Sequence, residues 1–305
     1  MMAEGGGATG PDPRSPDEPS SADRPSALGP RPSLLAIGAH PDDETMLAGG
    51  TLAWAARAGL RVEILSVTRG EGGEVGEPPV TSQERLGEVR EAELRCAAEA
   101  LGAAGVTFLP FVDPLVEATG VDPAPPSTLF RIDAAPEAFE RAIVEVIRAV
   151  RADVLLTHGT NGEFGHPQHL YTHETVRRAF ASAGDPAAFP DLGAPHAPVA
   201  LYSWAAHLDT GGDEHLERLL NQDDPADWLL ELTPELLDAK ERAALCHRSQ
   251  HALFRRRRQA RTVREVLLPW ETLRRQALRP GATSDPLAEA LAAAPNAECG
   301  MRSAE

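Results

Sequence analysis

The sequence predicts an α/β protein with a three-layer, Rossmann-like fold around a mainly parallel sheet. Short apolar runs alternate with longer amphipathic runs from residue 33 onward, and 42% of the 305 residues are hydrophobic. A chain of this length and apolar content can bury one large core or two small ones. Alternating strands and helices favour right-handed βαβ units, whose sheet is covered on both faces.

The apolar runs are predicted to be the strands of that sheet. Each run is rich in Val, Ile, Leu or aromatic residues and is bounded by Gly, Pro or polar residues, which is typical of buried strands. The predicted strands cover residues 33–39, 61–68, 105–111, 153–159 and 198–204.

Helical periodicity fills the segments between and after these strands. Thr81 and Glu84 predict a capping box at the start of one helix, and Gly102 predicts its end. Thr233 and Pro234 predict the N-cap and first turn of the last long helix. The predicted helices cover residues 45–59, 81–102, 135–152, 167–184 and 233–258, whereas residues 207–232 have an ambiguous pattern.

Composition along the chain predicts one domain between two tails. Residues 1–32 are dense in Gly, Pro, Ser and Asp and hold few large apolar side chains, so we expect a disordered N-terminal tail. Residues 33–285 are expected to form a single domain. Residues 286–305 are Ala-rich and end in small polar residues, which predicts a loosely ordered C-terminal tail.

The net charge of the chain argues against two classes of binding partner. A net charge of −17 and a pI near 5.0 argue against binding to nucleic acid or to an anionic membrane surface. The run Arg255–Arg258 is accordingly interpreted as a solvated helix face beside acidic neighbours rather than a phosphate site. The N-terminal residues lack the pattern of a signal peptide, and no apolar run reaches about 18 residues. We expect a cytoplasmic protein.

The cysteines agree with a reducing compartment. Cys96, Cys246 and Cys299 lie far apart in the sequence and form no C-x-x-C motif. Neither a disulfide framework nor a thiolate metal cluster is therefore expected.

Two polar segments follow predicted strands and carry residues that can bind metal. AHPDDE follows the first strand, and THGTNGEFGHPQHLYTH contains the end of the fourth. Because the carboxyl ends of parallel strands meet at one sheet edge, we expect the two segments to converge. Histidines and carboxylates without thiolates suit Zn²⁺ or Fe²⁺, and three protein ligands leave a position for water. The segments offer His40, Asp42, Asp43, Glu44, His158, His166, His169 and His173.

A dinucleotide site is the weaker interpretation of this sheet edge. No glycine-rich phosphate loop follows the first strand, where a dinucleotide fold needs one. The glycine-rich segment TRGEGGEVGE follows the second strand instead, and its acidic residues would repel a pyrophosphate.

Several motifs are similar, in order and spacing, to those of a known enzyme family. They are AHPDDE, TRGEGGEVG, the RxxEL pattern that begins at Arg90, GHPQH and KERAALCHRSQ. The chain resembles the LmbE-like (PIG-L) family of zinc-dependent N-deacetylases, which includes the mycothiol- and bacillithiol-pathway deacetylases. The resemblance covers roughly residues 33–253.

The resemblance implies a role for each residue that it matches. A zinc ion lowers the pKa of bound water to about 7, and a nearby carboxylate can take the proton. A cationic imidazole on the other side would stabilise the oxyanion. By resemblance, the metal ligands are His40, Asp43 and His169, the general base is Asp42, the carbonyl-polarising residue is His166, and the substrate-binding residues are Arg90 and Asp113.

The chain departs from the family pattern at two positions. Phe164 stands where the mycothiol-pathway enzymes carry a tyrosine, so it cannot donate a hydrogen bond. Gln168 stands where many members have an acid, and it is expected to orient His166 without raising the pKa of that imidazole by charge. Glu44 is interpreted either as an acceptor for a ligand histidine or as a helix N-terminal charge.

The remaining histidines are expected to be structural. Two interpretations of His247 stay open: it resembles a family position, and it can also be a helix-packing residue. The histidines assigned a structural role are His158, His173, His207 and His251.

The expected function is therefore hydrolytic. The chain would remove the N-acyl (acetyl) group from an N-acetylglucosaminyl compound or a related small amide-bearing metabolite, with Zn²⁺ or alternatively Fe²⁺. The alternatives are an amidase acting on thiol conjugates, a non-catalytic metal- and sugar-binding relative, and a nucleotide-binding Rossmann protein. The expected partner is a small N-acyl amino sugar, and the oligomeric state, a homo-oligomer included, is left open.

Overall fold

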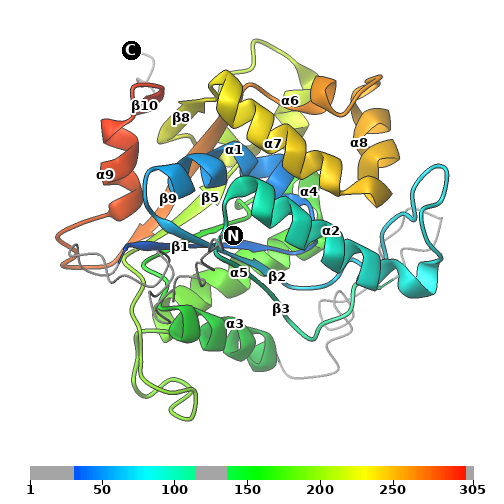
Figure 1. The fold of residues 1–305 in the computed structure, drawn as a ribbon. Helices are drawn as coiled ribbons and strands as arrows, with labels where there is room; N and C mark the ends of the chain where they lie inside the picture. The colour runs from blue at the N-terminus through cyan, green and yellow to red at the C-terminus, as the bar shows by residue number, and fades with distance from the viewer. Residues whose placement is uncertain (1–30, 115–135, 300–305) are drawn as a thin grey trace, which may run out of the picture. The chain divides into compact units, whose positions relative to one another are not determined.

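A computed structural model describes residues 31–114 and 136–299 of the chain (Figure 1). The chain divides into two compact units, Met1–Arg31 and Pro32–Glu305, and every element below lies in the second. The predicted disordered tail, residues 1–32, lies outside the described residues except for its last two positions.

The centre of the described unit is an eight-stranded mixed sheet with the order β10-β8-β9-β5-β4-β1-β2-β3. Neighbours from β3 to β5 in this order run parallel, whereas β9, β8 and β10 extend the sheet by antiparallel pairing. The strands are β1 (Ser33–Gly38), β2 (Arg61–Ser66), β3 (Gly105–Phe108), β4 (Val154–Thr157), β5 (Ala200–Trp204), β8 (Trp228–Glu231), β9 (Trp270–Leu278) and β10 (Ala297–Cys299). A separate short sheet pairs β6 (Ala206–His207) with β7 (Asn221–Pro225).

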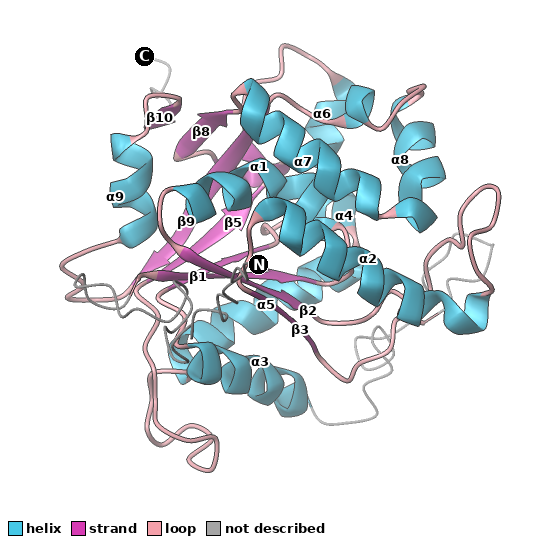
Figure 2. Ribbon diagram, in the orientation of Figure 1, coloured by secondary structure: helices cyan, strands magenta, loops and turns pink. Residues whose placement is uncertain are grey.

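Helices cover both faces of the sheet, as Figure 2 shows, so the predicted three-layer α/β class is confirmed. Alternate side chains of β1 enter two separate cores: Leu34 packs with α1, α2, α7 and α9, and Leu35 with α3 and α5. The helices are α1 (Asp43–Arg57), α2 (Leu86–Leu101), α3 (Pro136–Val150), α4 (Gly162–Gly165), α5 (Pro167–Ser182), α6 (Glu214–Leu219), α7 (Pro234–Cys246), α8 (His251–Arg258) and α9 (Pro286–Ala293). None of these described helices combines the length and the apolar character needed to cross a membrane.

The strand order reverses at β1, and this reversal positions the candidate site. The chain proceeds from β1 to β2 and β3 on one side, then crosses to β4 and β5 on the other. The helices that follow β1 and β4, α1 and α5, therefore lie on opposite faces of the sheet. Such a switch point opens a crevice beyond the carboxyl ends of the two strands, which is where open α/β sheets bind ligands.

The predicted start of α2 is wrong and its predicted end is confirmed. The helix begins at Leu86 after the 3-10 turn Gln83–Arg85, and neither the turn nor the helix has a side-chain cap. The Gln83 side chain instead donates to the carbonyl groups of Glu71 and Gly73, which binds this turn to the glycine-rich segment. Gly102 has the left-handed conformation expected of a residue that ends a helix.

The single long helix predicted over residues 233–258 is interrupted in the structure. Thr233 caps α7 as expected, but α7 ends at Cys246 and α8 begins only at His251. The backbone amide and the hydroxyl of Ser249 both donate to the buried carboxylate of Glu93 on α2. This carboxylate therefore competes with helical hydrogen bonding at the break.

Residues 286–299 are ordered, contrary to the expected loose C-terminal tail. Leu287 and Leu291 on α9 are fully buried in the core. The Asp285 carboxylate caps this helix and also accepts a hydrogen bond from the hydroxyl of Tyr202 at 2.6 Å. Strand β10 then pairs with β8. The prediction failed because it relied on the Ala-rich composition and overlooked Leu287 and Leu291, two apolar side chains at helical spacing.

A disulfide joins Cys96 on α2 to Cys246 at the end of α7, so the expectation of no disulfide is wrong. The two cysteines are separated by 150 positions in the sequence. They become neighbours only because α2 and α7 pack side by side on the same face of the sheet, and no spacing rule reports such a pair.

Candidate metal centre

The two predicted segments converge at the switch point. His40 lies two residues beyond the end of β1, and His158 directly follows the last residue of β4. A hydrogen bond joins the segments, because the backbone amide of Ala39 donates to the side-chain Nε2 of His158 at 3.1 Å. The sheet edge therefore brings histidines and carboxylates from both loops into one buried volume.

The first loop holds Asp42 in an unusual backbone conformation. Its φ of 129° lies in the region that favours glycine, and α1 begins at the next residue. The carbonyl of Asp42 accepts the amide of Met46 at 2.8 Å, while the Asp43 carboxylate accepts the amide of His40 at 2.8 Å. Strained residues of this kind persist where the surroundings fix them, and they cluster at functional sites.

His40, Asp43 and His169 have donor atoms at separations that fit one metal ion. His40 Nδ1 lies 3.5 Å and His169 Nε2 lies 3.3 Å from the Asp43 carboxylate, and the three ligand atoms fall within 4.8 Å of one another. Donors that are 2.0–2.1 Å from a tetrahedral ion lie about 3.3 Å apart. Burial opposes ionisation of Asp43, but His169 and His158 hold the pKa of its carboxyl well below its usual value.

Glu163 forms hydrogen bonds with two of the histidines at this centre, and this role was not anticipated from the sequence. Its fully buried carboxylate bonds Nδ1 of His158 at 2.7 Å and Nδ1 of His169 at 2.9 Å, and it also accepts from Gly159 and Asn221. These are hydrogen-bond lengths rather than the spacing of metal ligands. Burial raises the pKa of Glu163, but the histidines outweigh it and lower that pKa to about 2.

The signal for Glu163 was present in the sequence but ambiguous. An acid five residues after one histidine and six before another can serve as an orienting carboxylate. The spacing could not show this, because Glu163 has a positive φ of 35° inside an irregular turn.

His158 contacts the centre although it was expected to be a structural residue. It is fully buried, and its Nε2 lies 3.3 Å from the Asp43 carboxylate. His173, by contrast, bonds the backbone carbonyl of His158 through Nδ1 at 2.8 Å. That contact agrees with its structural assignment.

Gln168 and Asp113 form the wall beside His40. Oε1 of Gln168 lies 2.7 Å from Nε2 of His40, and the Gln168 amide nitrogen donates to Asp113 at 2.8 Å. Among the described residues Nδ1 of His166 has no hydrogen-bond partner, so the expected orientation of His166 by Gln168 does not occur through that atom.

His166 lies against the ligand histidines without joining them. Its ring stacks on His169 with centroids 4.4 Å apart and meets His40 edge-on at 5.2 Å. Burial, together with His169 and His40, lowers the pKa of His166 to about 2. This shift opposes the cationic imidazole expected from the sequence. A neutral imidazole can still donate one hydrogen bond.

Asp42 points to Arg90 rather than to the ligand set. A guanidinium nitrogen of Arg90 lies 3.1 Å from the Asp42 carboxylate, and Arg90 also donates to the carbonyl groups of Pro41 and Gly70. Burial raises the pKa of Asp42 above its usual value, although Arg90 opposes the shift.

Glu44 and His247 contact each other below the first loop. The Glu44 carboxylate accepts the backbone amide of Asp42 at 3.2 Å. His247 Nε2 lies 3.2 Å from the Thr45 hydroxyl and 3.7 Å from Glu44. Both residues are buried, so the pair braces the start of α1 from the side of α7.

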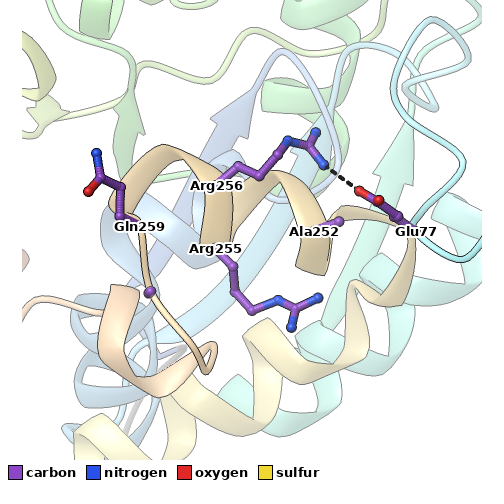
Figure 3. Close-up of a pocket in the computed structure, with 6 residues that line it drawn as sticks. Glu77, Ala252, Arg255, Arg256 and Gln259 are labelled. Carbon is purple, nitrogen blue, oxygen red and sulfur yellow. Dashed lines mark hydrogen bonds and ion pairs between the residues drawn. The ribbon is translucent and has the colours of Figure 1, made fainter.

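A pocket on α8 lies apart from this centre (Figure 3). Within it Arg256 pairs with Glu77. The same guanidinium also binds Glu74, which does not line the pocket. Arg256 therefore has the acidic neighbours expected for the arginine run. The pocket is lined by Glu77, Ala252, Arg255, Arg256, Gln259 and Ala260, none of which belongs to the candidate centre.

Comparison with known proteins identifies the family. The family model for PIG-L, described as GlcNAc-PI de-N-acetylase, matches residues 35–180. The 1D-myo-inositol 2-acetamido-2-deoxy-alpha-D-glucopyranoside deacetylase of Rhodococcus opacus is 35% identical over 243 residues, which are 71% of this chain and 81% of that protein. The chain belongs to the PIG-L family. An enzyme of the same name from Catenulispora acidiphila is 34% identical over 205 residues, which are 64% of this chain and 62% of its own length.

Solved structures of proteins whose names give different chemistries share this fold. The 4-carboxy-2-hydroxymuconate hydratase GalB of Pseudomonas putida matches with a TM-score of 0.56 at 20% identity, covering 83% of this chain and all of that one. The N,N'-diacetylchitobiose deacetylase of Pyrococcus horikoshii matches with a TM-score of 0.56 at 18% identity, covering 80% and 83%. At these identities the likeness establishes the fold alone, and a reaction has to be argued from the site.

The region matched by the PIG-L model contains the seven residues to which the resemblance gives a metal-binding, catalytic or substrate-binding role. The structure brings the proposed ligands together, with Asp42 and His166 at their edges. Arg90 and Asp113 lie behind Asp42 and His40, respectively, as buried hydrogen-bonding residues.

Proposed function

We propose that this chain hydrolyses the N-acyl amide of an N-acetylglucosaminyl compound, or of a related small amide-bearing metabolite, to release a carboxylate and a free amine. The observation that carries the proposal is the arrangement around Asp43. Nδ1 of His40 and Nε2 of His169 lie 3.5 and 3.3 Å from the Asp43 carboxylate, and the adjacent Asp42 holds its own carboxylate against Arg90. The names of the inositol-linked relatives support the same chemistry.

The residues at the centre fit a divalent metal ion, with His40, Asp43 and His169 as its ligands. Imidazole and carboxylate donors without thiolate suit Zn²⁺, which we propose, and also Fe²⁺. When bound, such an ion supplies Lewis-acid activation of water and of the amide carbonyl. His158 and Glu163 remain hydrogen-bonded to each other in this assignment.

The neighbouring side chains would move the proton and stabilise charge. Asp42 takes the proton as water forms its bond to the carbonyl carbon, and the departing nitrogen receives a proton as the C–N bond breaks. His166, stacked on His169 with an unpartnered Nδ1, donates a hydrogen bond to the developing oxyanion as a neutral imidazole.

Arg90 and Asp113 are proposed as sugar contacts on the family resemblance alone. Arg90 is 3% and Asp113 is 7% exposed, and both bond to the loops around the centre. Those contacts favour a role in holding the loops.

The test is metal analysis of the purified chain together with amine release from a panel of N-acetylglucosaminyl compounds. We expect about one equivalent of zinc or iron, loss of turnover on chelation and recovery on reloading. The panel includes inositol-linked, chitobiose and thiol-conjugate amides. Release only from thiol conjugates would favour the amidase alternative, and sugar binding without release would favour a non-catalytic relative.

A further inference from the structure

The two proposed ligand histidines meet different partners through the nitrogen that faces away from Asp43. His40 faces Asp43 with Nδ1 and contacts Oε1 of Gln168 with Nε2, at 2.7 Å. His169 faces Asp43 with Nε2 and contacts Glu163 with Nδ1, at 2.9 Å. The two imidazoles are therefore presented in opposite senses.

The partner of His169 determines where its proton lies. The Glu163 carboxylate can only accept hydrogen bonds, so Nδ1 of His169 carries the proton and Nε2 keeps its lone pair. The other contacts of Glu163 agree, because Gly159 and Asn221 both donate to it. Nδ1 of His158 faces Glu163 in the same way, and its Nε2 lies close to both the amide of Ala39 and the Asp43 carboxylate.

The orientation of Gln168, the partner of His40, is set by a further residue. The amide nitrogen and oxygen of a glutamine are distinguished only by their neighbours. Asp113 accepts from Gln168 at 2.8 Å and from the backbone amide of Gly72 at 3.2 Å, so its carboxylate draws the NH₂ end of Gln168 toward itself. Oε1 of Gln168 then faces His40 and requires the proton on Nε2. Nδ1 of His40 is left with its lone pair toward Asp43.

We propose that Gln168, held by Asp113, and Glu163 are positioning residues that fix His40 and His169 as opposite tautomers, with Nδ1 of His40 and Nε2 of His169 as the metal-binding atoms. This inference rests on the proposed metal site but not on the identity of the substrate. Partners behind a ligand histidine set its tautomer and ring orientation. His169 has an anionic partner, the Glu163 carboxylate. His40 has a neutral partner, the Gln168 amide, which is itself oriented by the Asp113 carboxylate.

The tautomers can be read directly on the zinc-loaded full-length protein. Long-range ¹H–¹⁵N correlation of ¹⁵N-histidine-labelled protein reports which ring nitrogen carries a proton, and ten histidines give a tractable spectrum. We expect a proton on Nε2 of His40 and on Nδ1 of His169, assigned by comparison with the His40→Ala and His169→Ala spectra. A zinc-bound His40 that carries its proton on Nδ1 would overturn the proposal, whether or not any amide is hydrolysed.

An exchange of the two polar groups tests the relay itself. Gln168→Glu sets two carboxylates against each other. Asp113→Asn replaces one of the two oxygens that accept from Gln168 and Gly72 with an NH₂ donor, so the Gln168 amide loses the carboxylate that orients it. Each single change is expected to lower zinc affinity by about 10–100-fold, measured by chelator competition. The double variant Gln168→Glu/Asp113→Asn restores a donor and an acceptor in reversed order, so its affinity should return to within a few-fold of the starting protein. Losses that simply add would contradict the relay.

A matched control separates this effect from the general cost of altering a buried glutamine. Gln250 is 1% exposed, and its amide donates to the Glu74 carbonyl and to Ser249, with no contact to the ligand set among the described residues. Gln250→Met should leave zinc affinity unchanged, whereas Gln168→Met should lower it. Equal effects of the two substitutions would show that Gln168 is merely structural. If no amide in the panel is hydrolysed, the deacetylase proposal fails while these metal readouts stand.

Discussion

The guanidinium of Arg90 lies 3.1 Å from the carboxylate of Asp42 and is almost wholly buried beneath it. The same side chain donates to the carbonyl groups of Pro41 and Gly70, so it binds the first loop to the glycine-rich segment. Glu93, three positions later on the same helix, accepts from Ser249 instead of pairing with Arg90. Arg90 thus supports the strained residue that is proposed to be the general base.

Arg90→Ala is expected to lower kcat rather than only raise KM. Removing the guanidinium takes the Arg90 donor from the Pro41 carbonyl and the Asp42 carboxylate, while the Gly70 carbonyl keeps the amide of Gly73. The loss should cost about 1–3 kcal/mol of stability. A displaced Asp42 should cost about 10²-fold in kcat. Steady-state kinetics and chemical denaturation measure the two effects. Arg95→Ala is the control, because Arg95 lies on the same helix and pairs with Glu91 at the surface. A raised KM with unchanged kcat would instead indicate a sugar contact.

Asp42→Asn is expected to leave the metal bound while reducing kcat by about 10²–10⁴, the usual contribution of a positioned general base. The shape and size of the side chain are kept, and Asp42 faces Arg90 rather than the proposed ligands. Metal content and kcat are measured on the same preparation. Asp43→Asn provides the contrast, since it should lose metal and activity together. An Asp42→Asn variant with near-normal turnover would rule out this base.

His169→Ala and His166→Ala are expected to differ in their effects on metal content, although the two residues are only three positions apart. His169 Nε2 faces Asp43, so its removal should empty the metal site. His166 stacks beside the ligands, so its removal should retain the metal and lower kcat by about 10²–10³. Metal retained in His169→Ala but lost from His166→Ala would reverse the assignment of the two histidines.

Much of the fold was predictable because its signals are local. The five parallel strands are apolar runs bounded by turn residues, and each was predicted within a few positions of its observed bounds. Strand β9, with the sequence WETLRRQAL, was missed because charged residues interrupt its pattern. It pairs antiparallel with β5 and β8, and that tertiary pairing overrides a weak local preference.

The candidate site was predictable where chemistry and topology coincide. Two polar loops at one sheet edge were enough to bring His40 and His169 together in the prediction. Glu163 and the Gln168–Asp113 contact were not accessible in this way, because each depends on an irregular turn or on a loop distant in sequence. The partners of a ligand are set by packing, which residue spacing does not report.

Cleavage of the Cys96–Cys246 disulfide is expected to destabilise the chain. The bond closes a loop with a sequence separation of 150, and a disulfide of a long loop typically contributes about 2–4 kcal/mol. Cys246→Ser should lower the free energy of unfolding by this amount in denaturant titrations. Thiol titration of the unfolded, unreduced chain should find only Cys299 free. Three reactive thiols before reduction would contradict the bond, and Cys299→Ser is the control that should leave stability unchanged.

Removal of the C-terminal segment tests whether α9 belongs to the core. The Leu291 side chain is fully buried, so Leu291→Ala should lower the free energy of unfolding by about 2–5 kcal/mol. Leu278→Ala is the matched control, because this leucine is 43% exposed and its truncation should change stability by no more than about 0.5 kcal/mol. A chain ending at residue 285 should lose more than Leu291→Ala, since it also removes β10 from its pairing with β8. Thermal and chemical unfolding measure all three variants. An unchanged transition in the shortened chain would restore the expectation of a loose tail and show that the apolar contacts of α9 contribute nothing to stability.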